Sequence, residues 1–103
     1  MDAQLFPRPH QAQVDVPPRP RQTIRPVNPK GAQRRGEQGE VELEVDVESD
    51  GAVVAVSVIR SSGFPDLDEA AVKAMRRAVF RPARAGSEAV RSTVRQKLEF
   101  RLK

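Results

Sequence analysis

The sequence predicts an α+β fold in which a three-stranded antiparallel sheet packs on one main helix, in the chain order β-β-α-β. Apolar and acidic side chains alternate over residues 39–48, a second valine-rich run covers 52–59, and strict alternation returns in 90–103. Such a period of two is typical of strands. Residues 66–79, between the second and third strands, carry apolar side chains at helical spacing.

The first two strands are predicted to form a hairpin over residues 39–60. The apolar face of the first strand consists of Val41, Leu43, Val45 and Val47. Asp50-Gly51 separates the two strands, and this dipeptide readily adopts the positive φ values of a tight turn. We therefore expect the chain to reverse there.

The main helix is predicted to run from about Asp66 to Val79. Asp66 is expected to be the N-cap, with Glu69 three residues later completing a capping box, and Pro82 cannot continue the helix. The alanine-rich face implies a close approach to the sheet. The expected buried side chains are Leu67, Ala70, Ala71, Ala74 and Ala78, with Phe64, Met75 and Phe80 adding bulk.

The order of the strands follows from the direction of the chain. The helix brings the chain back, so the third strand runs parallel to the second; in an antiparallel sheet it must then pair with the first. The expected spatial order is 2-1-3, which also places the basic third strand beside the acidic first strand. The third strand, residues 90–103, is longer than the first, so part of it should overhang its partner.

Composition excludes several classes of function. The chain has no cysteine and one histidine, His10, which lies in a proline-rich segment. Thiol catalysis, disulfides, zinc–thiolate sites and histidine-based triads are therefore excluded, and we expect no enzyme activity, no catalytic residue, no metal and no cofactor. Nucleic acid is not an expected partner either, because four phenylalanines are too few and too dispersed for base stacking.

The N-terminal segment differs from the rest of the chain. Seven of the nine prolines lie in residues 1–30, together with most of the excess positive charge. Proline fixes φ and removes a backbone donor, so we expect residues 1–22 to be a disordered, extended linker and residues 23–103 to form the domain.

Four segments of the chain form a pattern characteristic of one protein family: Gly36–Val41, Asp50–Val53, Ser61–Ala71 and Ala74–Pro82. In these segments the chain resembles the C-terminal domain of the TonB family of Gram-negative energy transducers. Residues 25–29 are similar to the family's Gln-Pro-x-Tyr-Pro motif, with Arg25 in place of glutamine and Asn28 in place of tyrosine. Ala78 stands where a tryptophan is usual, and residues 30–35 take the place of a short helix before the first strand.

The resemblance implies a protein without a catalytic step of its own. Such a domain would bind the TonB box of an outer-membrane receptor as an extra strand beside its last strand. It would pass force from the proton-driven ExbB–ExbD motor of the inner membrane and so drive uptake of siderophore, haem or vitamin B12. We expect the chain to be a periplasmic piece of a longer protein, anchored to the inner membrane by a helix missing here.

The strand-addition hypothesis places the receptor peptide along the third strand. The candidate residues are Arg91, Ser92, Thr93, Val94, Arg95, Gln96, Lys97, Leu98 and Phe100, with Arg25, Pro26 and Pro29 expected beside the strand. Whether odd or even residues bond the peptide depends on register. The free edge also permits a strand-exchanged homodimer. The alternative function is a TolA-like or other envelope-spanning interaction module that does not serve receptor-mediated uptake.

Overall fold

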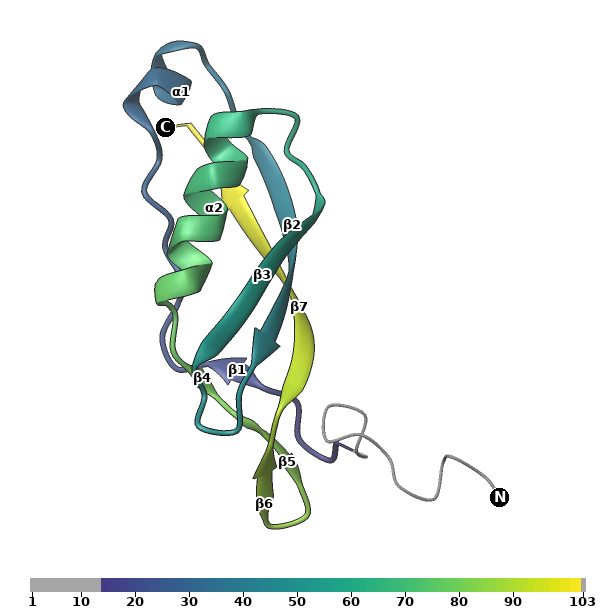
Figure 1. Cartoon of the computed structure of the whole chain (residues 1–103). Coiled ribbons are helices and arrows are strands. Elements are labelled where there is room, and N and C mark those ends of the chain that lie inside the picture. Colours follow the sequence, from purple (N-terminus) through teal and green to yellow (C-terminus); the bar gives the residue numbers. More distant parts are fainter. Residues whose placement is uncertain (1–13, 103) are drawn as a thin grey trace, which may run out of the picture.

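The computed structural model describes residues 14–102, and its centre is a three-stranded antiparallel sheet with one helix packed on it (Figure 1). The strands are β2 (Gly39–Val47), β3 (Val53–Arg60) and β7 (Ser92–Phe100). They are ordered β3-β2-β7, which confirms the predicted 2-1-3 arrangement. The helix α2 (Pro65–Arg77) covers one face, and a short helix α1 (Lys30–Arg34) precedes β2 as expected.

The core lies between α2 and the sheet. The alternating pattern of β2 has its predicted consequence, since all four of its valine and leucine side chains are fully buried. From α2 come Leu67, Ala71, Ala74 and Met75, and β7 adds Leu98 and Phe100. Phe80 is the largest fully buried side chain. The small alanines allow the close approach between helix and sheet that the sequence predicted.

The predicted capping box at the start of α2 is wrong. The helix begins at Pro65, and its N-cap residue Phe64 makes no side-chain capping bond. Proline suits this first position because its φ is already helical and its missing N–H would be unpaired there. Asp66 instead pairs with Arg35 at 2.6 Å, and Glu69 pairs with Lys73 at 3.1 Å.

The turn between β2 and β3 depends on Gly51. Its φ is +91°, and a Cβ at this position would lie 2.1 Å from the carbonyl oxygen of Phe80. The Phe80 N–H donates to the Gly51 carbonyl at 2.9 Å, so the turn is joined directly to the segment that follows α2. This pairing also explains why α2 ends at Arg77, two residues before the predicted Val79: Ala78 is extended and Val79 bridges Ala52.

The third predicted strand is divided in two. β6 (Glu88–Val90) pairs with β5 (Ala83–Ala85) as a separate hairpin, and β7 begins after Arg91. Every residue of β7 has a partner in β2, from Ser92 opposite Val47 to Phe100 opposite Gly39. The expected overhang of an unpaired strand end is therefore wrong: Val90 pairs within the β5–β6 hairpin, and Arg91, Arg101 and Leu102 belong to no strand.

The N-terminal segment contacts the chain that follows α2. β1 (Arg19–Pro20) pairs with β4 (Phe80–Arg81), and Val16 bridges Arg84. These pairings begin before residue 23, the expected start of the domain; residues 1–13 of the predicted linker lie outside the described residues. Within residues 14–102, no helix is long and apolar enough to cross a membrane.

Candidate functional site

The candidate site is the free edge of β7. One edge of β7 is bonded to β2 along nine consecutive residue pairs. Along the other edge, no strand in the described part of the chain pairs with β7. Its backbone groups are thus available to an additional strand.

The register determines which backbone groups point outward. The Glu48 N–H donates to Ala52, at 2.8 Å, and is therefore directed toward β3. Backbone groups alternate in direction along a strand, so the odd-numbered residues of β2 are directed toward β7. Since Val47 lies opposite Ser92 in an unbroken register, even-numbered residues of β7 bond β2 and odd-numbered residues point outward.

A separate hydrogen bond at the other end of the strand agrees with this assignment. The N–H of Leu102, an even-numbered residue, donates at 3.3 Å to the side chain of Gln38, which precedes β2. The outward N–H and C=O groups at the centre of β7 are therefore those of Thr93, Arg95 and Lys97. This settles the parity that the sequence left open.

The side chains of β7 divide between the two faces of the sheet. Leu98 and Phe100 belong to the core, and Ser92 is also buried. Val94 and Gln96 are half-buried on the same face. Thr93, Arg95 and Lys97 are exposed on the opposite face, as is Arg91 just before the strand. The predicted site residues on β7 thus lie together, but only the odd-numbered ones offer both backbone groups and exposed side chains to a partner.

The exposed face of β7 lies against the acidic face of β2. The Thr93 hydroxyl donates to Asp46 at 2.7 Å, and Arg91 pairs with Glu48 at 3.7 Å. Arg95 is opposite Glu44 and Lys97 is opposite Glu42 in the register. Neither of these two cations is within 4 Å of an acidic oxygen in residues 14–102. Both therefore remain available to a carboxylate of a partner.

The other edge of the sheet is less suitable for adding a strand. β3 has register shifts against β2 at two places, near Val54 and near Ile59. Such irregularities interrupt the regular spacing of outward groups that an added strand needs. β7 has no such shift along its nine pairs with β2.

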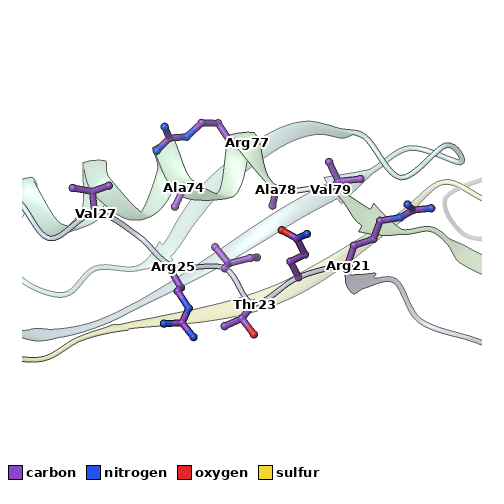
Figure 2. Close-up of a pocket in the computed structure, with 10 residues that line it drawn as sticks. Arg21, Thr23, Arg25, Val27, Ala74, Arg77, Ala78 and Val79 are labelled. Atoms are coloured by element: carbon purple, nitrogen blue, oxygen red, sulfur yellow. The ribbon is translucent and has the colours of Figure 1, made fainter.

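The three predicted residues of the N-terminal segment lie outside the ladder between β2 and β7. Residues 21–29 run alongside α2, and Arg25 lines a groove of about 590 Å³ between this segment and the helix (Figure 2). Pro29 lines a smaller neighbouring groove, and Pro26 is half-buried. The structure does not bring these residues into the β7 ladder.

The loop before α2 is held by a carboxylate that sequence reasoning did not single out. Asp68 accepts hydrogen bonds from the Ser62 N–H at 2.9 Å and the Ser62 hydroxyl at 2.7 Å, and from the Ser61 hydroxyl. Burial opposes ionisation of Asp68, but these bonds outweigh it and lower its pKa. Within residues 14–102 no three histidine or carboxylate side chains are placed to hold a metal ion.

Comparison with known proteins identifies the family. A family model described as the Gram-negative bacterial TonB protein C-terminal domain matches residues 24–102. The chain belongs to this family. The match covers α1, the whole sheet and α2, and so includes the free edge of β7.

Individual relatives agree with this result. Protein tonB2 of Pseudomonas aeruginosa and protein TonB of Xanthomonas campestris pv. campestris are each 42% identical to the chain over 77 residues, which is 75% of its length. The chain spans only 28% and 34% of these relatives, respectively.

Two solved structures share the fold. The solution structure of the P. aeruginosa TonB C-terminal domain has a TM-score of 0.67 at 25% identity, covering 86% of this chain and 90% of that one. The corresponding domain of Helicobacter pylori has a TM-score of 0.60 at 27% identity, covering 75% and 69%.

Sequence reasoning missed the groove beside α2. Its walls combine the extended segment 21–27 with residues Ala74 and Arg77 of the helix, which are about fifty positions apart in sequence. The sequence contains only a weak indication of this groove: Val27 and Val79 are large apolar residues that belong neither to the alternation of the strands nor to the apolar spacing of the helix. Only the folded chain shows that they line the same groove.

Proposed function

We propose that this domain binds the TonB box of an outer-membrane receptor as an additional strand along the free edge of β7. In the full-length protein, the domain would lie in the periplasm. A membrane helix outside this chain would link it to the ExbB–ExbD motor of the inner membrane. Force transmitted through the added strand would then open the receptor for uptake of siderophore, haem or vitamin B12.

One observation carries the proposal. In a chain of the TonB C-terminal family, the strand β7 is fully paired on one side and, within residues 14–102, unpaired on the other. The register directs the N–H and C=O groups of Thr93, Arg95 and Lys97 outward. Main-chain bonds of this kind are largely independent of the peptide sequence, so they suit a domain that serves receptors of different sequence.

The exposed side chains support the choice of partner. Arg95 and Lys97 face the same way as each other and lack an ion pair within residues 14–102. They would attract a carboxylate on the receptor segment and accelerate the encounter more than they strengthen the final complex. The edge would keep its shape through pairing with β2 and packing on the helix-covered face by Ser92, Val94, Gln96, Leu98 and Phe100. Arg91 would contribute through its ion pair with Glu48.

The experiment is a titration of isotope-labelled chain with a TonB-box peptide, followed by amide chemical shifts. We expect the largest changes at Thr93, Arg95 and Lys97, with smaller changes at the even-numbered residues between them. Largest changes on β3 with β7 unaffected would contradict strand addition at this edge. Capture of outer-membrane receptors on the immobilised chain would then name the natural partner.

The same edge would also support a strand-exchanged homodimer. Two copies paired antiparallel through β7 would bring Arg95 and Lys97 of one close to those of the other, which is unfavourable. We therefore expect dimers only at high protein concentration and at high salt, where these charges are screened. Sedimentation equilibrium across both variables would test this expectation.

A further inference from the structure

The groove between residues 21–27 and α2 is lined by no residue of β7, and its chemistry differs from that of the β7 edge. Its volume is about 590 Å³. The two most exposed large apolar side chains of the described residues both line it: Val27 is 70% exposed and Val79 is 54% exposed. Ala74 and Ala78 lie between them, so an apolar strip runs along the groove. The lining also includes the polar residues Gln22 and Thr23.

Three arginines line the same groove, and no acidic residue does. They are Arg21, Arg25 and Arg77. None of their guanidinium groups is within 4 Å of an acidic oxygen in the part of the chain that the structure describes. An apolar surface with unpaired positive charges around it is complementary to a ligand with apolar groups and negative charges.

The positions of the arginines indicate an extended ligand. Figure 2 shows Arg77 on the helix, Arg25 on the facing segment and Arg21 near the end beside Val79. The guanidinium groups do not converge on one point, so a single phosphate-sized anion could not engage all three. Separate carboxylates along a peptide could do so, because side chains along an extended strand are spaced by several ångströms.

A second groove extends the first along α2. It has a volume of about 390 Å³ and shares Val27 and Arg77 with the larger groove. Its two acidic side chains, Asp66 and Glu69, are already paired with Arg35 and Lys73. From Ala70 to Arg77 the two grooves follow α2 for roughly 10 Å at the helical rise of 1.5 Å per residue. This length matches about three residues of an extended peptide.

We propose that this double groove, which we call the helix groove, binds a short acidic peptide segment in which carboxylates alternate with aliphatic side chains. A polynucleotide is a poorer match because the groove contains no aromatic side chain for base stacking. The partner is thus a protein, and this inference does not depend on whether β7 adds a strand.

The test uses the complete chain and a fluorescein-labelled hexapeptide of alternating aspartate and valine. Fluorescence anisotropy gives the affinity and amide shifts give the position. We expect shifts at Val27, Ala78 and Val79, and affinity that falls with added salt. A hexapeptide of alternating lysine and valine should not bind. Shifts confined to Arg95 and Lys97 would show that the peptide binds at the β7 edge instead, and would overturn the proposal.

Matched variants distinguish binding in the helix groove from attraction to the positive charge of the domain as a whole. Arg25→Gln and Arg77→Gln should each weaken binding about two- to fivefold, the change expected for one exposed ion pair. Arg76→Gln is the control, because Arg76 is next to Arg77 in sequence but lines a different surface, beside β3. If Arg76→Gln and Arg77→Gln lose the same amount of peptide affinity, the peptide does not bind in the helix groove and the proposal is refuted.

Two further experiments test whether the groove must be open and whether it binds lipid instead of peptide. Ala78→Phe places a ring in the groove without removing charge, and should abolish the shift at Val27. Ala78 follows the last helical residue in an extended conformation, so this substitution does not interrupt α2. If vesicles of phosphatidylglycerol bind in an Arg77-dependent way and the acidic hexapeptide does not, the groove recognises a lipid surface and the peptide proposal is wrong.

Discussion

Arg95→Pro is the substitution that most directly tests how the β7 edge works. Proline has no backbone N–H, and the Arg95 N–H is one of the groups directed outward by the register. Val94, which precedes it, is already extended in β7, as a residue before proline must be. The substitution therefore removes a donor from the free edge without removing a bond between β7 and β2.

The expected loss of peptide affinity can be worked out from the ladder. An outward residue of an antiparallel pair exchanges two hydrogen bonds with its partner. The substitution removes the donor, and the ring displaces the peptide from the neighbouring carbonyl, so both bonds are lost. At about 0.5–1.5 kcal/mol each, the loss is about 1–3 kcal/mol. This corresponds to roughly a 5- to 150-fold weaker Kd.

Two further variants separate the possible causes. Arg95→Thr removes the charge but keeps the N–H, and should weaken binding by about fivefold or less, as one exposed ion pair would. Gln96→Pro removes a bond to β2, because even-numbered residues point inward and Gln96 lies opposite Leu43. It should destabilise the free domain by about 1–3 kcal/mol, whereas Arg95→Pro should cost about 1 kcal/mol or less.

The assay combines isothermal titration with a TonB-box peptide and urea unfolding of each variant. If Arg95→Pro binds as tightly as Arg95→Thr, the edge does not use this N–H and strand addition is refuted at its centre. If instead Arg95→Pro unfolds more easily than Gln96→Pro, the inferred parity is wrong and the even-numbered residues point outward.

Three other outcomes follow from the structure. Gly51→Ala should destabilise the domain by about 2–4 kcal/mol in urea unfolding, because a positive φ disfavours a side chain and the new Cβ would meet the Phe80 carbonyl; a change under 0.5 kcal/mol would contradict this reading. Phe80→Ala should cost about 3–5 kcal/mol, since the ring is fully buried, and a two-state thermal melt would measure it. Asp68→Asn should be less stable than the parent chain at neutral pH. Because the folded-state pKa of Asp68 lies below its ordinary 3.8, the parent's advantage is complete above that value and disappears as pH falls through the folded pKa. A difference that is unchanged down to pH 2 would exclude the carboxylate as its source.

The sequence by itself determined the elements and their order. A strand with one buried face requires alternation, and β2 and β7 show it clearly enough to predict which side chains are in the core. The Asp50-Gly51 turn and the direction of the chain then left one antiparallel order for the three strands. The charges on β2 and β7 agreed with it, and so the free edge of β7 was predictable from local patterns alone.

The tertiary structure decided what depends on segments that meet across the fold. The helix α2 begins at Pro65 rather than at Asp66. It ends at Arg77 because the residues that follow it pair with Gly51 and with Arg19–Pro20. The outward parity of β7 follows from the hydrogen bonds of β2 in the hairpin, which no side-chain pattern records. The helix groove likewise exists only because residues 21–27 lie against α2. The periodicity of a segment shows which of its side chains are buried and which are exposed. It does not show which distant segment lies beside it, and that neighbouring segment determines the partner of each backbone N–H.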